Sequence, residues 1–431
     1  MKINSEKIKK VHFIGIGGIG ISAIARMMLD LGKIVSGSDG ADSRVVKDLR
    51  NLGANIYIGH SEKALKKDVN LVVYTIAISK ENPEFLKAKK LKIQTLSYPE
   101  MLGAVSEGFR TIAVSGTHGK TTTTAMLSGV LIDALLKPSV IVGSLLKGSG
   151  SNYIKGNGKF FLVEACEYKR SFLNLKPEIL IINNIEEDHL DYYQNLADIQ
   201  SAFRELAQSV PLGGFIVCKA KDKNLKPVLS GISSEKIVDY TEFIDEKLNL
   251  KVPGRHNLLN AAASLAVGSL LKIDKKKIKK SLLEYSGIWR RFEFKGKTAV
   301  GASVYDDYAH HPSEIEATLK GARGIFKGKI VVVFQPHLYS RTKRFLKEFG
   351  RSFRRADEVI VLPIYAAREL EDSSINSKML AEEINKNKVR AKYKENFDEC
   401  SDYLSKHLKK GDFLMTIGAG DVFKIGESLL T

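Results

Sequence analysis

The chain has 431 residues, 44% of them hydrophobic and 27% charged, so it has the composition of a globular protein and is too long for one hydrophobic core. Its 67 lysines and arginines against 49 acidic residues give a net charge of +18, but the basic residues are scattered or in short runs without interleaved aromatics, which argues against a nucleic-acid partner. Three cysteines in no metal-like spacing argue against a disulfide framework, and no apolar run approaches the length that crosses a membrane. We therefore expect a cytoplasmic enzyme with no membrane partner.

Short apolar strands alternate with amphipathic helices along the whole chain, which predicts an α/β fold with mostly parallel sheets. Three blocks each begin with a strand that leads into a polar or glycine-rich loop. We place the domains at 1–108, 109–287 and 288–431. We expect a Rossmann-like N-terminal domain, a central P-loop ATPase-like parallel-sheet domain and a C-terminal Rossmann-like α/β domain.

The first block opens with a glycine-rich loop. The strand Val11–Gly15 leads into Gly15-Ile-Gly-Gly-Ile-Gly20 and a helix over 21–31, and a second strand, 34–39, ends in Asp39. This is the pattern of a dinucleotide-binding fold, and an NAD-dependent oxidoreductase is the first interpretation. The loop, however, offers only a backbone that can come close to a diphosphate and a carboxylate that can accept a hydrogen bond from a hydroxyl group. These two features suit any nucleotide diphosphate, including a UDP-sugar. Tight strand-to-helix packing without a ligand would also explain the glycines.

A phosphate-binding loop is predicted at the start of the second block. The strand 111–114 is followed by Gly116-Thr-His-Gly-Lys-Thr-Thr122 and a helix over 125–132. The glycines let backbone N–H groups face phosphate oxygens, Lys120 supplies a cation, and Thr121 offers a hydroxyl to Mg²⁺. The spacing Gly-x-x-Gly-Lys-Thr matches the common motif only in part. A turn without a ligand explains the glycines, but not Lys-Thr-Thr at a strand-to-helix junction.

Two further strands of this block end in polar residues. The strand 160–164 ends in Glu164, and the strand 179–183 leads into an acidic segment that contains His189. Because ligands of a parallel sheet gather at strand ends, Glu164 and His189 are candidates to hold Mg²⁺ against the nucleotide phosphates. The alternative is that the acids at 186–188 form a solvated helix start.

Asn257 and Asn260 lie beside an alanine-rich segment that predicts a helix. Their side chains would either cap that helix or read an adenine edge, and the chemistry of the two amides favours neither. Both alternatives stay open from the residues alone.

The third block gathers polar and aromatic groups in two turns. Val304–Pro312 includes Asp306, Tyr308 and two histidines, and the segment after the next strand contains His337 and Arg341. A zinc site built from these histidines fits poorly, because cysteines are absent and two of the histidines are adjacent. Recognition of an anion and an amine by Arg341 and the histidines fits better.

Together these motifs resemble those of the Mur ligase family along essentially the full chain. Besides the two glycine-rich loops and the strand end at Glu164, the resemblance rests on Asp188-His189, His256-Asn257-x-x-Asn260, Arg290-Arg-Phe292, Asp306-Asp-Tyr-x-His-His-Pro312 and Gln335-Pro-His-x-x-x-Arg341-Thr. The branch that it resembles ligates L-alanine to UDP-N-acetylmuramate in peptidoglycan precursor synthesis. The resemblance implies three domains that bind the UDP-sugar, ATP and the amino acid in that order.

The resemblance also implies roles for individual residues. The residues implied for the UDP-sugar are Gly15, Gly17, Gly18, Ile19, Gly20, Ser38 and Asp39. Those for ATP are Gly116, Thr117, His118, Gly119, Lys120, Thr121, Thr122, Asn257, Asn260, Arg291 and Asp306. Thr121, Glu164 and His189 would serve the metal, and Tyr308, His337 and Arg341 the amino acid, with Lys120, His189, His337 and Arg341 as the catalytic set.

Two segments depart from the family pattern. Where relatives commonly carry Asp-Glu-Ser-Asp, this chain has Cys166-Glu-Tyr-Lys-Arg170, which leaves the contacts of this segment to the sugar's lactyl carboxylate open, although Lys169 and Arg170 could serve an anion. Leu338 replaces an arginine found beside the histidine in many relatives, so one amino-acid contact is expected to be absent.

The implied reaction is an ADP-forming amide ligation through an acyl phosphate, with ATP and Mg²⁺ as cofactors. The expected partners are UDP-N-acetylmuramate and L-alanine, and the expected state is a monomer or weak homodimer. The third block would have to close onto the second, because the amine and the phosphorylated acid come from different domains. Three alternatives remain: a murein-recycling ligase that adds a tripeptide to the same sugar, an NAD-dependent oxidoreductase, and a non-catalytic nucleotide-binding protein.

Overall fold

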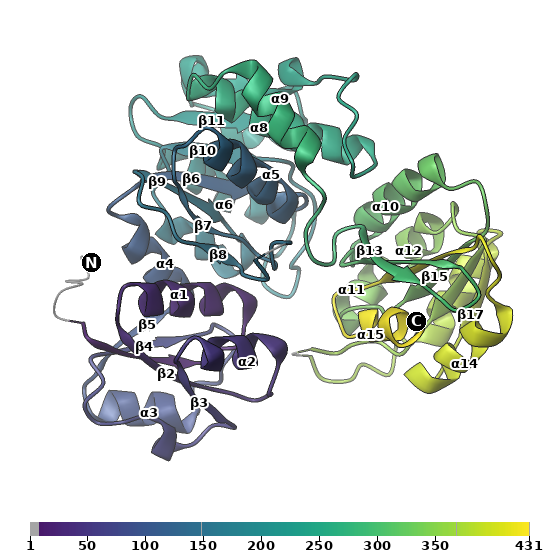
Figure 1. Cartoon of the computed structure of the whole chain (residues 1–431), viewed down its shortest axis with the longest axis horizontal. Helices are drawn as coiled ribbons and strands as arrows, with labels where there is room; N and C mark the ends of the chain where they lie inside the picture. The colour runs from purple at the N-terminus through teal and green to yellow at the C-terminus, as the bar shows by residue number, and fades with distance from the viewer. Residues whose placement is uncertain (1–7, 148, 368, 431) are drawn as a thin grey trace. The chain divides into compact units, whose positions relative to one another are not determined.

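The computed structural model describes residues 8–147, 149–367 and 369–430. Within them the strands form three sheets, and neighbouring strands run parallel except in the pairs β7–β8 and β13–β14. The predicted fold class is confirmed, with parallel-dominated sheets and connecting helices (Figure 1). The chain divides into two compact units: the first runs to Asp245 and includes Asn260–Leu282, and the second comprises Glu246–Leu259 and the residues from Leu283 onward.

The first sheet has the strand order β3-β2-β1-β4-β5. Its strands are β1 Lys10–Ile14, β2 Ile34–Asp39, β3 Asn55–Ile58, β4 Leu71–Tyr74 and β5 Gln94–Ser97. Its helices are α1 Ile19–Asp30, α2 Arg44–Asn51, the short 3₁₀ helix η1 Glu62–Ala64, α3 Pro83–Lys90 and α4 Tyr98–Ser106. The order reverses between β1 and β4, so the loops after these two strands flank the position where such sheets bind ligands.

Alternation along β1 explains why helices cover both faces of this sheet. Phe13 packs in the same core as residues of α1, whereas Ile14 packs with Phe85 of α3 in a smaller cluster. In Figure 1 α1 and α3 lie on opposite faces of the sheet. Strands buried on both faces read as continuous apolar runs, which is why β1 was readable from the sequence.

The second sheet has the order β12-β11-β10-β6-β9-β7-β8. Its strands are β6 Arg110–Ser115, β7 Ser139–Ile141, β8 Tyr153–Ile154, β9 Phe160–Glu164, β10 Ile179–Ile182, β11 Phe215–Cys218 and β12 Ile237–Asp239. The helical segments are α5 Lys120–Asp133, η2 Tyr168–Asn174, α6 Leu196–Gln208, α7 Lys226–Leu229, η3 Ser234–Lys236, η4 Tyr240–Phe243, α8 Arg255–Leu270 and α9 Lys275–Glu284. Because β6 lies between β9 and β10, the ends of these three parallel strands meet at one edge of the sheet.

Two of the alternatives that the sequence left open, both about helix starts, are excluded by the structure. The acids at 186–188 do not start a helix, because α6 begins at Leu196 and is capped by Asn195. Asn257 and Asn260 do not cap the alanine-rich helix, because α8 already begins at Arg255 and contains both. Gly254 adopts a left-handed backbone (φ 103°) just before it, which allows this earlier start.

The third sheet has the order β13-β14-β18-β15-β16-β17. Its strands are β13 Glu293–Lys297, β14 Ser303–Asp307, β15 Ile330–Phe334, β16 Glu358–Val361, β17 Arg390–Tyr393 and β18 Phe413–Ile417. Its helices are α10 Pro312–Ile325, α11 Tyr339–Arg344, α12 Leu346–Ser352, α13 Ser377–Lys386, α14 Phe397–His407 and α15 Phe423–Ser428. Apolar clusters line both faces of this sheet, one with α10, α12 and α13 and the other with α14 and α15.

Candidate functional site

The predicted phosphate loop joins β6 to α5 and leaves the helix N-terminus open. Gly116 (φ 129°) and Gly119 (φ 80°) both adopt left-handed backbone conformations, and Gly119, the N-cap of α5, makes no side-chain cap. A Cβ on Gly119 would lie 2.5 Å from Asn260 Oδ1 and 2.9 Å from Asn183 Nδ2. Glycine is therefore required there by both backbone and space, and the first N–H groups of α5 are available to an anion.

Lys120 folds back over this loop. Its ammonium donates to the carbonyls of Gly116 (2.5 Å) and Thr117 (3.0 Å) and pairs with Glu167 at 2.9 Å. Burial alone would lower the pKa of Lys120, but the carboxylates of Glu167 and Glu164 raise it above its ordinary value. Lys120 is thus held as a cation. Glu167 is 2% exposed and was not among the predicted site residues.

The predicted metal-binding residues lie around the same loop. Thr121 Oγ1 donates to Glu164 Oε1 at 3.1 Å, and the other oxygen of Glu164 accepts from Gly143 N at 2.8 Å. His189 Nε2 lies 3.8 Å from Glu167, and its Nδ1 is buried without a hydrogen-bond partner among the described residues. A hydroxyl, a carboxylate and an uncommitted imidazole nitrogen form a donor set that fits a divalent cation, and the two oxygen donors suit Mg²⁺.

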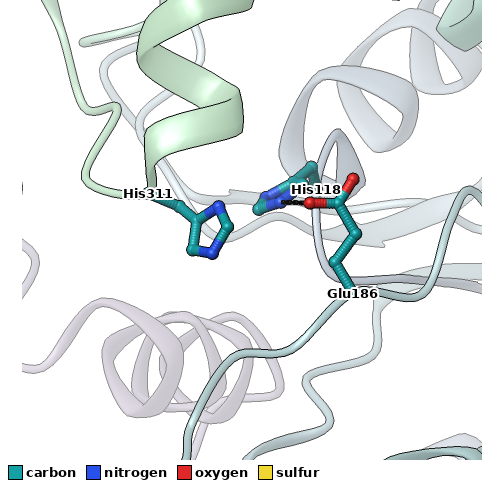
Figure 2. A group of neighbouring side chains, drawn as sticks. All are labelled: His118, Glu186 and His311. Atoms are coloured by element: carbon teal, nitrogen blue, oxygen red, sulfur yellow. Dashed lines mark ion pairs between the residues drawn. The ribbon is translucent and has the colours of Figure 1, made fainter. Parts of the chain in front are cut away.

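The segment after β10 supports the loop from the side. Asn184 Oδ1 accepts from His118 N at 2.8 Å, and the side-chain amides of Asn183 and Asn184 both donate to His118 O at 3.2 Å. The ring of His118 pairs with Glu186 at 3.4 Å, as the dashed line in Figure 2 shows. No local pattern reveals the two asparagines, because each acts on atoms of the loop more than 60 residues earlier in the chain.

Asn260 reaches the start of α5. Its Oδ1 accepts from Thr123 Oγ1 at 3.1 Å, so this amide lies beside the phosphate loop. Asn257, in the second unit, donates from Nδ2 to Pro253 O at 2.7 Å. Near it, burial lowers the pKa of His256 to about 4, with Glu314 acting to raise it and Arg291 to lower it. His256 is therefore neutral at pH 7.

The glycine loop of the first sheet presents a second open helix N-terminus. Gly18, the N-cap of α1, makes no side-chain cap, and Gly17 N donates to Asp39 Oδ2 at 2.8 Å. A Cβ on Gly17 would lie 2.9 Å from that carboxylate oxygen, and one on Gly15 (φ 77°) would lie 2.4 Å from Thr75 Cγ2. The loop can thus approach a ligand closely with its backbone, and Asp39 stands beside it.

A buried polar network behind this loop was not predicted. His12 Nε2 and Glu84 Oε2 are 2.7 Å apart with both side chains fully buried, and the second oxygen of Glu84 lies 3.1 Å from His60 Nδ1. Ser38 Oγ contacts the same ring nitrogen at 3.0 Å. Burial would raise the pKa of Glu84, but its hydrogen bonds with His12, Ser38 and His60 lower it below the ordinary value. The network holds the predicted Ser38 in place.

In the second unit, Asp306 is buried and fully engaged. Its Oδ2 pairs with Arg290 Nε at 2.8 Å, and its Oδ1 accepts from Thr416 Oγ1 at 2.6 Å. Contact of Asp306 with ATP would require this pair to open. Arg291 lies over the Tyr308 ring (5.3 Å) and 3.8 Å from Glu314.

The predicted amino-acid residues lie together in this unit. Arg341 Nη1 lies 3.0 Å from His337 Nδ1, and the His337 ring stacks with Tyr365 at 5.9 Å. His310 connects the group, with its ring 5.8 Å from that of His337 and 5.6 Å from that of Tyr308.

The two departures from the family pattern take definite positions. Arg170 pairs with Asp198 (2.8 Å) and Glu205 (3.3 Å), and Lys169 lies over the Tyr168 ring. Leu338 is 1% exposed, so it belongs to the interior of the second unit.

Family models match most of the chain. The Mur ligase family catalytic domain matches residues 10–110, the Mur ligase middle domain residues 114–243, and the Mur ligase glutamate ligase domain residues 290–420. Within the described residues, no helix has the length and apolar character needed to cross a membrane.

Similar proteins extend over the whole chain. The UDP-N-acetylmuramate–L-alanine ligase of Clostridium kluyveri is 44% identical and covers all of both chains. The crystal structure of UDP-N-acetylmuramate–alanine ligase from Thermotoga maritima superposes with a TM-score of 0.81 at 29% identity, covering 97% of this chain and 98% of that one. A murein peptide ligase from Psychrobacter arcticus shares the fold, with a TM-score of 0.71, 22% identity and 98% of each chain covered.

Proposed function

This chain belongs to the Mur ligase family, and on that basis we propose that it joins L-alanine to the carboxylate of UDP-N-acetylmuramate in peptidoglycan synthesis, with ATP converted to ADP. Members of this family are ATP-dependent. The observation that carries the proposal is Lys120, held as a cation on a glycine loop beside the Thr121–Glu164 pair. The full-length relative at 44% identity supports alanine as the amine substrate.

We assign one ligand to each of three domains. Residues 1–108 would bind the UDP-sugar through the loop from Gly15 to Gly20 and through Ser38 and Asp39. Residues 109–287 would bind ATP, and residues 288–431 the amino acid. The open N-termini of α1 and α5 support this assignment, because each suits an anionic phosphate group.

The proposed chemistry needs ATP because a carboxylate oxygen is a poor leaving group. The γ-phosphoryl group moves from ATP to one carboxylate oxygen of the sugar acid, which forms an acyl phosphate and releases ADP. The alanine nitrogen then attacks the carbonyl carbon and loses a proton, and phosphate leaves with that carboxylate oxygen. Lys120 and the loop N–H groups lower the barrier by neutralising charge that develops on the transferred phosphoryl group.

Lys120 has to change partner during this reaction. Its ammonium pairs with Glu167 and two loop carbonyls, whereas phosphate binding would take the same ammonium. Mg²⁺, when bound by Thr121, Glu164 and His189, would supply further positive charge at the phosphates.

The amino-acid residues suit a zwitterion. A guanidinium can bind both oxygens of a carboxylate, and Arg341 lies beside His337 and is only 6% exposed, so the guanidinium is largely shielded from water. His337 would accept the amine proton only as a neutral ring. Tyr308 would complete the pocket, because its ring contacts the ring of His310, which in turn contacts the ring of His337.

The remaining partners and the location follow from these substrates. We propose two small-molecule partners, no nucleic acid, a monomer or weak homodimer, and a cytoplasmic site of action. The three cysteines are all free, which fits a reducing compartment.

A substrate-omission assay tests the proposal. Phosphate release should require ATP, UDP-N-acetylmuramate and L-alanine together, and the product mass should equal the sugar nucleotide plus one alanine residue. Lys120→Ala should be inactive, and the exposed-lysine control Lys221→Ala should match the unmodified chain. Phosphate release that requires a tripeptide and does not respond to L-alanine would instead identify the chain as the murein-recycling ligase.

A further inference from the structure

Asn152 connects the two halves of the first unit. It immediately precedes β8 and is fully buried. Its Nδ2 donates to Ile19 O and, at 2.9 Å, to Ser22 Oγ in the first turn of α1. This is the helix whose open N-terminus is assigned above to the UDP-sugar.

The main chain of Asn152 leads to the proposed metal site. The carbonyl of Asn152 accepts from Val142 N at 3.0 Å, and Gly143, which follows Val142 in the chain, donates its N–H to Glu164 at 2.8 Å. The other oxygen of Glu164 accepts from Thr121 at 3.1 Å. Four residues (Asn152, Val142, Gly143 and Glu164) and five hydrogen bonds therefore join the start of α1 to the start of α5.

The position of Asn152 is costly, which suggests a purpose beyond packing. Its Oδ1 is buried with no hydrogen-bond partner among the described residues, and an unsatisfied buried acceptor destabilises the folded state. A smaller apolar residue would fill the site without that cost. What such a residue would lose is the contact with α1.

We propose that Asn152 is a positioning residue that couples UDP-sugar binding to the geometry of Glu164, and hence to the affinity for ATP with Mg²⁺. The inference rests on the function proposed above. A diphosphate at the N-terminus of α1 shifts or orders the first turn of that helix. Asn152 moves with the turn through its hydrogen bonds to Ile19 and Ser22. The paired strands β7 and β8 then move the Gly143 N–H that holds Glu164. The phosphate site is thereby completed when the acceptor sugar is present.

The test is a linkage measurement. The dissociation constant of a non-hydrolysable ATP analogue with Mg²⁺ is measured by calorimetry with and without saturating UDP-N-acetylmuramate. In the unmodified chain the sugar should tighten analogue binding at least about fivefold, the lower end of typical allosteric coupling. The coupling ratio is the dissociation constant of the analogue without the sugar divided by that with the sugar. Asn152→Ala, and Asn152→Asp, which keeps the shape but loses the donor, should bring this ratio close to one. The affinity for each ligand alone should change less than about threefold.

Controls separate positioning from folding. Asn157→Ala, at an exposed asparagine beyond β8, should keep the full ratio. If Asn152→Ala does not fold, Ser22→Ala removes one of the two acceptors and should reduce the ratio in part. A ratio of one in the unmodified chain, or an unchanged ratio in a folded Asn152 or Ser22 variant, overturns the inference.

Turnover measured on the same samples keeps the two proposals distinct. If the unmodified chain ligates alanine and Asn152→Ala leaves the ratio unchanged, the coupling role is wrong and the function stands. If the unmodified chain does not ligate alanine, the proposed function fails whatever the ratio.

Discussion

Replacing Gly143 by alanine tests whether Glu164 is placed to hold a metal. A Cβ at this position would lie 2.5 Å from Glu164 Oε2 and 2.6 Å from Oε1, and real Cβ atoms do not approach oxygen so closely. The backbone of Gly143 does not have a positive φ, so alanine adds a contact without backbone strain. The carboxylate must therefore move, and its hydrogen bond from Gly143 N is lost or lengthened.

The size of the effect follows from that hydrogen bond. A hydrogen bond to a charged group contributes about 1.5–3 kcal/mol, which corresponds to about 10- to 150-fold in a binding constant. We expect the Mg²⁺ concentration for half-maximal ligation to rise by a factor in this range, with UDP-N-acetylmuramate binding less affected.

The assay is a Mg²⁺ titration of phosphate release at saturating substrates. Gly108→Ala is the matched control, because a Cβ there meets no atom within 4 Å and its φ is not positive. An unchanged Mg²⁺ requirement in Gly143→Ala would refute the assignment of Glu164 to the metal.

Four further predictions concern other parts of the molecule. Lys120→Ala should reduce turnover far more than tenfold (about 1.4 kcal/mol of barrier) while UDP-sugar affinity measured by calorimetry is retained, and turnover within tenfold would remove Lys120 from the mechanism. Gly17→Val should weaken UDP-sugar binding, since its side chain would crowd Asp39, and NAD should not bind; tight NAD binding in calorimetry would contradict this. Arg341→Lys should raise the Michaelis constant for L-alanine much more than that for ATP, and a rise confined to ATP would place the alanine pocket elsewhere. Because the pKa of His256 is lowered to about 4, the unfolded chain binds a proton there first, so this residue costs stability as the pH falls from about 6.5 to about 4; His256→Gln should flatten that part of the melting-temperature profile, and an unchanged slope would show that the ring is not buried neutral.

The sequence was sufficient for the framework of the fold. Runs such as 160–164, 330–334 and 413–417 are the observed β9, β15 and β18, because strands buried on both faces need continuous apolar residues. The glycine loops were also readable, since their left-handed positions at Gly15, Gly116 and Gly119 allow few other residues. Short strands such as β7 and β8 carry too few residues for any periodic signal.

The parts that were missed depend on contacts between distant segments. Glu167 lies 47 residues from Lys120, and a single carboxylate in Cys-Glu-Tyr-Lys-Arg has no local pattern that reveals its partner. Asn152 lies 133 residues from Ile19 in a glycine- and serine-rich stretch that reads as a loop. The burial of Asp306 against Arg290 likewise became visible only from the packing of the third sheet.

An isotope-transfer measurement tests the proposed reaction most directly. UDP-N-acetylmuramate labelled with ¹⁸O in both carboxylate oxygens is incubated with the chain, ATP and L-alanine, and the released phosphate and the amide product are analysed by mass spectrometry. Activation as an acyl phosphate predicts one ¹⁸O in each phosphate and one in each amide carbonyl, with ADP as the nucleotide product. Phosphate without ¹⁸O, or the label in AMP, would contradict it.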